Sequence, residues 1–246
     1  ASSQNLGLQG LLSVNPFRKY LIRNLNSEGR DNVLNYRKLI VESGKRMLNS
    51  GLTVETWGNI SAKDFNTGLI YLTPSGMDYS TITEEDILIC DADGNIVEGF
   101  RKPTIEKDLH TAVYEHRPEV SAILHTHPIY SMVYAVQGKD IPMITDEAAQ
   151  ALGGIVRCTE YALPGSKELA QKCVLALDKK SNACLLNSHG AVCLGKDMDS
   201  AFKTAKVLEM TAQIKYMVEA SGGKPLGISD QNISAMQEMA QNYGQK

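Results

Sequence analysis

The sequence has little excess of either charge and no long apolar run. Its 25 Lys and Arg residues are nearly balanced by 28 Asp and Glu residues, giving a formal net charge of −3 over 246 residues. Because the two signs are mixed along the chain, we expect no nucleic-acid partner and no membrane binding. The apolar stretch near the start, LGLQGLLSV, is too short to span a bilayer and has no basic segment before it. A soluble protein with a small-molecule partner is therefore predicted.

Paired cysteine motifs are also absent. The five cysteines are odd in number, show no CxxC spacing and lie mostly within apolar stretches. This arrangement favours buried, reduced thiols over a disulfide framework and so predicts a cytoplasmic protein. The residues concerned are Cys90, Cys158, Cys173, Cys184 and Cys193.

No linker, internal repeat or low-complexity tract divides the chain, which is long enough for one substantial hydrophobic core. Residues 1–32 are interpreted as an N-terminal extension or helical arm, and residues 33–246 as a single domain. From residue 32 to 49, apolar residues recur at helical spacing and Gly51 follows, which predicts a helix with a glycine stop.

Short β-prone segments follow, separated by Gly, Pro, Asn and Asp, and they predict a sheet. The connection DADGN (91–95) superficially resembles a calcium loop. Its glycine comes too early and the distal Glu is absent, so a hairpin turn is predicted instead. The predicted strands lie in NISAKD (59–64), LIYLTP (69–74), DILICDADGNIVEG (86–99) and SAILHTH (121–127).

Helical patterns occupy much of the remaining chain, and two apolar strands flank NSHG (187–190). This order of elements predicts an α/β or α+β fold in one layered unit. The predicted helices are one capped by Thr104 that ends before Pro118, one capped by Ser166, one from about 197 to the glycines at 222 and 223, and a shorter one after Ser229.

Two histidines at the end of an apolar strand suggest a metal site. Alternation along the strand places His125 and His127 on one face, with Cα atoms roughly 6.6–6.8 Å apart, so both imidazoles can reach one ion. His189, at a strand end with Gly190 behind it, is the candidate third ligand of a zinc site with an open position. The alternative for the first pair is a strand end that bonds backbone and water.

The other polar candidates, His116, His110 and Glu106, can also be explained by structural roles. His116 is interpreted as a solvated helix end, where the helix dipole favours a cation, and His110 as a residue at the edge of the core. Glu106, in the first turn of the helix before the two histidines, can approach the same cleft or serve only the helix dipole, and these two roles are compatible.

Together these residues resemble the class II aldolase/adducin family, and within it the zinc-dependent sugar-phosphate aldolases of the fuculose-phosphate aldolase type. The resemblance runs from about Asn35 to Tyr243. It implies a three-layer α/β/α fold with a mostly antiparallel central sheet, assembled as a cyclic (C4) homotetramer with active sites at subunit interfaces. The five motifs that carry it, in order, are TWGNIS (56–61), LTPSGM (72–77), KPTIEKDLH (102–110), HTHP (125–128) and NSHG (187–190).

The resemblance also implies a reaction, the reversible cleavage of a ketose 1-phosphate to dihydroxyacetone phosphate and an aldehyde. One Zn²⁺ per chain acts as a Lewis acid and stabilises an enediolate. Glu106 is the base, and we expect its pKa to lie nearer neutrality than that of free Glu. The implied roles are zinc ligation by His125, His127 and His189, phosphate binding by Asn59, Ser75, Gly76 and Thr104, and assistance by Tyr243 lent by a neighbouring subunit.

Two positions depart from the family pattern. Ile105 follows Thr104 where these aldolases usually show Ser-Ser, which removes one hydroxyl from the expected phosphate pocket. Asp146 follows IPMI where those enzymes place a tyrosine that helps to protonate the aldehyde oxygen. Asp146 either takes over this acid chemistry through a raised pKa or caps the following helix.

Two other functions are compatible with the same scaffold. A dehydratase of the methylthioribulose-1-phosphate type would also use three histidines and a Glu. An adducin-like interaction module would keep the fold but lose the ligand histidines, all of which are present here. The related ribulose-phosphate 4-epimerases usually have Asp at the position of Glu106, so the sequence argues against that activity.

Overall fold

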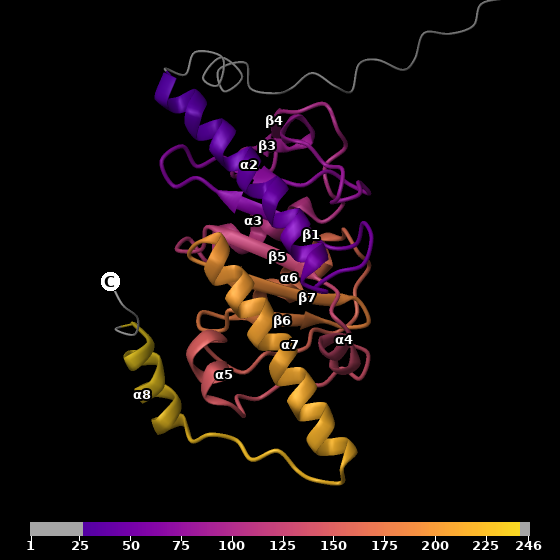
Figure 1. Ribbon diagram of the computed structural model, residues 1–246, viewed down its shortest axis with the longest axis vertical. Helices are drawn as coiled ribbons and strands as arrows, with labels where there is room; N and C mark the ends of the chain where they lie inside the picture. The colour runs from indigo at the N-terminus through magenta and orange to yellow at the C-terminus, as the bar shows by residue number, and fades with distance from the viewer. Residues whose placement is uncertain (1–26, 242–246) are drawn as a thin grey trace, which may run out of the picture.

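Figure 1 shows the computed structural model, which describes residues 27–241. Most of the extension expected over residues 1–32 lies outside this range, as does Tyr243. The described residues form a mixed α/β domain with seven α-helices and one seven-stranded sheet. The helices are α2 (Ser27–Asn49), α3 (Lys107–His116), α4 (Ile129–Ala135), α5 (Asp146–Ala151), α6 (Lys167–Leu177), α7 (Met198–Ala220) and α8 (Asp230–Gln241).

Every pair of neighbouring strands in the sheet is antiparallel, as predicted, and the order is β4-β3-β2-β1-β5-β7-β6. The register sets Asn59 opposite His125, and His125 opposite Val192. The site residues of β1, β5 and β7, which are neighbours in the sheet, therefore meet at the same end of these strands. The strands are β1 (Asn59–Lys63), β2 (Ile70–Leu72), β3 (Leu88–Cys90), β4 (Ile96–Glu98), β5 (Ala122–Thr126), β6 (Ala183–Leu186) and β7 (Gly190–Gly195).

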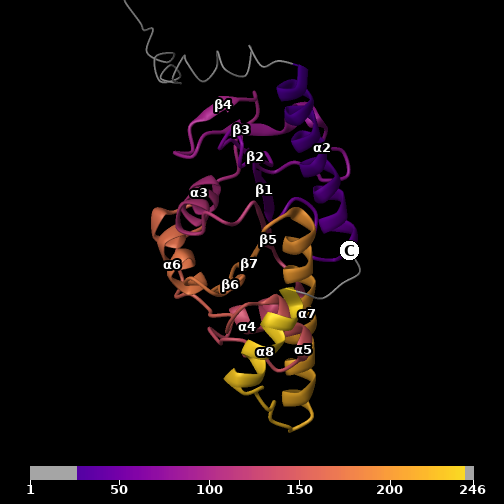
Figure 2. The ribbon, with the colours of Figure 1, turned by 90° about the vertical axis from the view of Figure 1, so that its left-hand side faces the viewer.

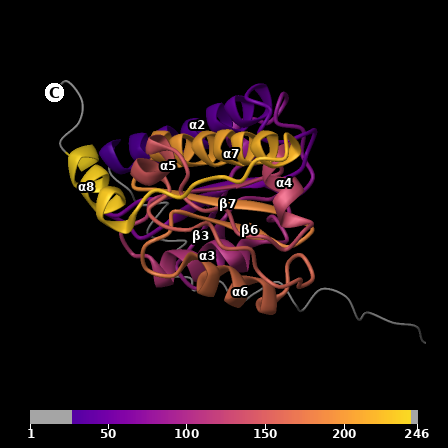
Figure 3. The same cartoon turned by 90° about the horizontal axis from the view of Figure 1, so that it is seen from below.

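Helices cover both faces of the sheet, which confirms the three-layer expectation. α2 and α7 lie across one face, and α3 and α6 lie across the other (Figures 2 and 3). Side chains that alternate along β5 enter two separate cores: Leu124 packs in one cluster with Phe202 of α7, and Ile123 packs in the other with Leu109 of α3. Both faces of the central strands are thus apolar, and the polar site residues gather where these strands end.

The helix ends agree with the sequence in part. Ser166 caps α6 by accepting a hydrogen bond from the backbone N–H of Leu169, as predicted. The first helix begins at Ser27 rather than near residue 32. The prediction that Thr104 caps α3 is wrong, because that helix begins at Lys107 and Glu106 occupies its N-cap position. Thr104 lies two residues earlier, where its hydroxyl accepts from the backbone N–H of Glu106 at 3.3 Å.

The short helix α4 was not predicted from the sequence, whereas a helix after Asp146 was expected and is present as α5. Thr145 caps α5 by accepting from the backbone N–H of Ala148, so the suggestion that Asp146 caps this helix is wrong. The predicted hairpin at DADGN is confirmed, because Asp91 lies between β3 and β4 and accepts from the backbone N–H of Asn95. Across residues 27–241, none of the helices has the length and apolar character needed to cross a bilayer.

Candidate active site

Three histidines from two separate parts of the chain converge at one end of the sheet. His125 is the fourth residue of β5, His127 follows that strand, and His189 lies in the turn between β6 and β7. Nε2 of His125 lies 3.0 Å from Nε2 of His127 and 3.2 Å from Nε2 of His189. One ligand atom from each residue lies within 4.8 Å of the others. The three histidines predicted to share one metal ion are therefore close enough together to do so.

The surroundings of His125 direct its ring nitrogen toward this centre. Its Nδ1 lies 3.0 Å from the carbonyl oxygen of Ala191, which can only accept, so Nδ1 carries a proton and Nε2 is the nitrogen that would bind a metal once the ring is neutral. Three imidazole nitrogens that face one another this closely suit a shared cation, since two nitrogens bound tetrahedrally to one Zn²⁺ lie roughly 3.3 Å apart. The donor set thus fits a zinc ion.

The glycine after the third histidine is needed for this packing. A Cβ at Gly190 would meet the carbonyl oxygen of Thr126 at 2.6 Å and Cε1 of His125 at 2.9 Å. Gly58, immediately before β1, is needed for the same reason. A Cβ there would meet the His125 carbonyl oxygen at 2.4 Å, and its φ of 73° favours glycine. Only residues without a side chain allow the backbone to approach the histidines so closely.

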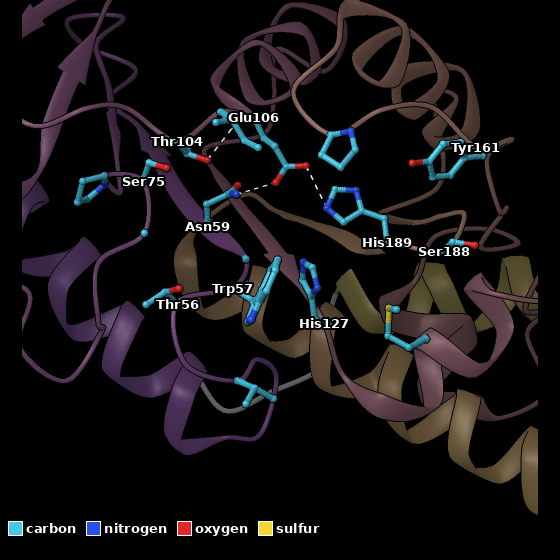
Figure 4. Close-up of a pocket in the computed structure, with 17 residues that line it drawn as sticks. Thr56, Trp57, Asn59, Ser75, Thr104, Glu106, His127, Tyr161, Ser188 and His189 are labelled. Carbon is cyan, nitrogen blue, oxygen red and sulfur yellow. Dashed lines mark hydrogen bonds and ion pairs between the residues drawn. The ribbon is translucent and has the colours of Figure 1, made fainter.

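Glu106 completes the cluster. Its Oε2 lies 3.1 Å from Nε2 of His125, and its Oε1 lies 3.3 Å from Nε2 of His189. Oε2 accepts a hydrogen bond from Nδ2 of Asn59 at 2.8 Å (Figure 4), whereas buried Oε1 accepts no hydrogen bond from residues 27–241 apart from its contact with the His189 ring. A buried carboxylate oxygen with no partner is costly. It therefore points to a group, a cation or a substrate proton, that this site is built to receive.

The pKa of Glu106 lies below its ordinary value, opposite to the expected shift. Burial raises this pKa, but the charge of His125, its hydrogen bond, His189 and the Asn59 amide together lower it further. Burial and the charge of His125 lower the pKa of His127 to about 3, and the same two effects lower that of His189 to about 4. Both rings are thus neutral near pH 7, the form that binds a metal. Burial lowers the pKa of His125, but Glu106 outweighs burial and raises it, so a metal ion would have to displace the Nε2 proton of this ring.

A cavity of about 660 Å³ opens beside the cluster. His127, His189 and Glu106 line it (Figure 4). The four residues expected to bind phosphate also line this cavity, so the fold brings segments around 59, 75 and 104 together with the histidines. These residues are Asn59, Ser75, Gly76 and Thr104, and Ile105 lies beside them with 64 % of its surface exposed.

Several cavity residues were not found from the sequence, and three of them bear on the chemistry of the site. Trp57 lies over His127, with ring centroids 6.0 Å apart, and Ser188 adopts a φ of 56°, unusual for a residue other than glycine. Tyr161 lies across the cavity from Asn59, and its hydroxyl is directed toward the side where Glu106 and His189 lie (Figure 4). Trp57 falls within the TWGNIS motif, which could have drawn attention to it; Tyr161 carries no comparable local signal.

The remaining candidates lie elsewhere. Asp146 is exposed in the first turn of α5 and is not among the cavity residues. His116 lies at the end of α3, as predicted, but it is half-buried rather than solvated, with Nε2 3.2 Å from the carbonyl oxygen of Asp178. His110 is fully buried rather than at the edge of the core. Tyr243 lies outside the described residues.

Comparison with known proteins agrees with this geometry. Residues 38–216 match the class II aldolase and adducin N-terminal domain, and the chain belongs to this family. It is 35 % identical over 210 residues to a 5-deoxy-D-ribulose 1-phosphate aldolase of Bacillus thuringiensis, covering 85 % of this chain and 97 % of that one. It is 31 % identical over 206 residues to the L-fuculose phosphate aldolase of Escherichia coli K12, covering 83 % and 94 % respectively.

A solved structure of an L-fuculose 1-phosphate aldolase superimposes with a TM-score of 0.80 at 33 % identity, covering 84 % of this chain and 96 % of that one. The predicted family and fold are therefore confirmed. The relatives are aldolases, which are lyases, and the chain is an enzyme of the class II aldolase kind.

Proposed function

We propose that the enzyme is a zinc-dependent aldolase that reversibly cleaves a ketose 1-phosphate to dihydroxyacetone phosphate and an aldehyde. The observation that carries the proposal is the meeting of three imidazole nitrogens with a buried carboxylate whose Oε1 has no hydrogen-bond partner, all at the wall of one cavity. Class II relatives named as ketose-phosphate aldolases support the same reaction.

His125, His127 and His189 would hold the zinc ion, which supplies Lewis-acid stabilisation of the negative charge that develops on the ketone side of the substrate. Glu106 then moves the proton at carbon. In the synthetic direction Oε1 removes the C3 proton of dihydroxyacetone phosphate and becomes protonated. Cleavage is the reverse, in which the protonated carboxyl of Glu106 gives its proton to C3 after the C3–C4 bond breaks. Near pH 7 Glu106 is ionised, the form that can accept a proton.

The aldehyde oxygen needs a separate proton donor. Tyr161 supplies a hydroxyl across the cavity from Asn59, and we assign it the proton that the C4 oxygen gains in synthesis and loses in cleavage. Asp146 remains a proposal for the same acid role, and Tyr243 remains a proposal for assistance by a neighbouring copy in a cyclic homotetramer.

Phosphate would lie against Ser75, Gly76 and Thr104, where hydroxyl and backbone N–H groups hold a dianion without a fixed positive charge. The apolar side chains of Val54, Trp57 and Ile105 also line the cavity, which favours an aldehyde with an apolar end, as 5-deoxyribulose and fuculose 1-phosphates would release. Five unpaired cysteines, four of them buried, support a location in the cytoplasm.

The test is to incubate the purified protein with fuculose, rhamnulose, ribulose and 5-deoxyribulose 1-phosphates and measure release of dihydroxyacetone phosphate. We expect release from at least one, about one zinc per chain, and loss of activity on chelation. Glu106→Gln should keep its zinc and lose turnover by about 10²–10⁴-fold. Loss of substrate without release of dihydroxyacetone phosphate would favour the dehydratase, and activity in metal-free protein would refute the proposal.

A further inference from the structure

A chain of hydrogen bonds runs from Glu106 into the layer between the sheet and α3. Asn59 joins Glu106 to His110: its Nδ2 donates to Oε2 of Glu106 at 2.8 Å, and its Oδ1 lies 2.5 Å from Nε2 of His110. On the other side of the ring, Nδ1 of His110 lies 2.6 Å from Oγ of Ser61, which lies 2.8 Å from the hydroxyl of Tyr114. His110 and Ser61 have no exposed surface.

The proton positions in this series of hydrogen bonds can be assigned one residue at a time, starting from Glu106. An ionised carboxylate only accepts, so the NH₂ group of Asn59 must face Glu106 and its carbonyl must face His110. His110 therefore donates from Nε2. Burial lowers the pKa of His110 to about 3, so the ring is neutral and its Nδ1 accepts from the Ser61 hydroxyl. Ser61 in turn accepts from Tyr114, and every donor in the chain points toward Glu106.

This directionality has a consequence for the carboxylate. Oε2 is engaged by Asn59, and Oε1 has no hydrogen-bond partner, so the two oxygens are not equivalent. If the Asn59 side chain rotated by half a turn, its carbonyl would face Oε2 and repel the carboxylate. The donor on His110 opposes that rotation, because a rotated amide would turn its NH₂ group toward the Nε2–H.

We propose that His110 is a positioning residue that acts through Asn59. By donating from Nε2 it fixes the orientation of the Asn59 amide, which holds Oε2 and leaves Oε1 as the oxygen that exchanges the substrate proton. The effect on turnover rests on the proposed aldolase function, whereas the tautomer and the orientation of the amide rest on the hydrogen-bond geometry and the burial of His110. His110, which the sequence analysis placed at the edge of the core, would thus contribute to the reaction.

Variants of the two residues separate this role from simple packing. His110→Phe keeps a ring but removes both hydrogen bonds, and we expect kcat to fall about 10- to 100-fold with KM and zinc content unchanged. His110→Gln can still donate to Asn59 from its side-chain amide and should recover most of that loss. His116→Phe is the matched control, because the same substitution at the half-buried end of the same helix should leave kcat unchanged.

The decisive measurement is a double-mutant cycle with Asn59→Ala. If His110 acts through Asn59, then adding His110→Phe to Asn59→Ala lowers kcat no further, because the amide to be oriented is already gone. A residue that only packs would reduce activity or stability by the same factor in both backgrounds. Multiplicative losses in the double variant would overturn the proposal, as would wild-type kcat in His110→Phe.

A second readout does not depend on activity. In protein labelled with ¹⁵N-histidine, the nitrogen chemical shifts of His110 should show the neutral Nε2–H tautomer near pH 7, with an Nε2 proton signal that moves in Asn59→Ala. A protonated Nδ1 would overturn the inference even if the enzyme is an active aldolase. If no ketose 1-phosphate is cleaved, the proposed function fails, and the tautomer still decides whether His110 orients Asn59.

Discussion

The backbone of Gly190 lies so close to the His125 ring that a Cβ there would meet Cε1 at 2.9 Å. The Gly190→Ala variant must therefore displace the ring or the strand, and the same methyl group would also meet the Thr126 carbonyl oxygen at 2.6 Å. Because three nitrogens must reach one ion, we expect zinc affinity to fall about 10- to 100-fold. Competition against a zinc-binding dye measures this directly.

Gly227 provides the control for that experiment. A Cβ at this position has no neighbouring atom within 4 Å, so Gly227→Ala should bind zinc as the wild type does. Unchanged zinc affinity in Gly190→Ala would mean that the three histidines do not form the metal site.

Glu209 stabilises the segment that carries His127. From α7 its carboxylate accepts hydrogen bonds from the backbone N–H groups of Tyr130 and Ser131 at 2.8 Å each, and so caps α4 immediately after the HTHP motif. Glu209→Ala would leave these N–H groups without an acceptor, and we expect a loss of about 2 kcal/mol in the free energy of unfolding. Urea denaturation measures this loss. Lys206→Ala, at an exposed position of α7, should change stability little, and equal stability of the two variants would contradict the capping role.

That cap illustrates why part of the fold was not predictable from the sequence. The long helices and the hairpin carry their signals within a few residues, as the Ser166 cap does for α6. α4 has only seven residues, and its N-terminus is satisfied by a side chain 78 positions away in the case of Ser131. Local propensity contains no trace of such a contact, because it exists only once α7 has packed beside α4.

Some residues of the site could likewise be predicted from local sequence and others could not. The spacing of His125 and His127 in a strand places both on one face whatever the rest of the fold does, so this pair was accessible from the sequence. Tyr161 lies three residues after Cys158, which pairs with Leu185 of β6, and the sequence does not reveal such a long-range pairing. The direction of the Glu106 shift was also missed, since burial was anticipated but the opposing effects of His125 and Asn59 depend on distances that the sequence does not contain.

Asp86 should make stability depend on acid pH. Burial raises its pKa, but hydrogen bonds from the Thr83 backbone and hydroxyl and the Arg101 ion pair outweigh burial and lower the pKa below its usual value of 3.8. A carboxylate whose pKa is lower when folded stabilises the protein above the unfolded pKa, and this contribution disappears as pH falls through the folded pKa. The stability difference between wild type and Asp86→Asn should thus be constant near neutrality and shrink below about pH 4.

Urea denaturation at a series of pH values checks this prediction for Asp86. Asp93→Asn, exposed in the nearby hairpin turn, is the control and should change stability little throughout. If the difference for Asp86→Asn stays constant down to pH 3, the carboxylate does not gain its stability from the bonds to Thr83 and Arg101.

Tyr161 can be separated from Glu106 because they would act at different bonds. Exchange of the C3 hydrogen of dihydroxyacetone phosphate with deuterated water needs the base and no aldehyde, whereas cleavage also needs proton transfer at the C4 oxygen. Tyr161→Phe should therefore keep the exchange rate while cleavage falls about 10²-fold, and Glu106→Gln should lose both. Proton NMR follows the exchange, and Tyr216→Phe, exposed on α7, is the control. Equal loss of exchange and cleavage in Tyr161→Phe would place this hydroxyl at the proton-abstraction step instead, and no loss in either would remove it from the reaction.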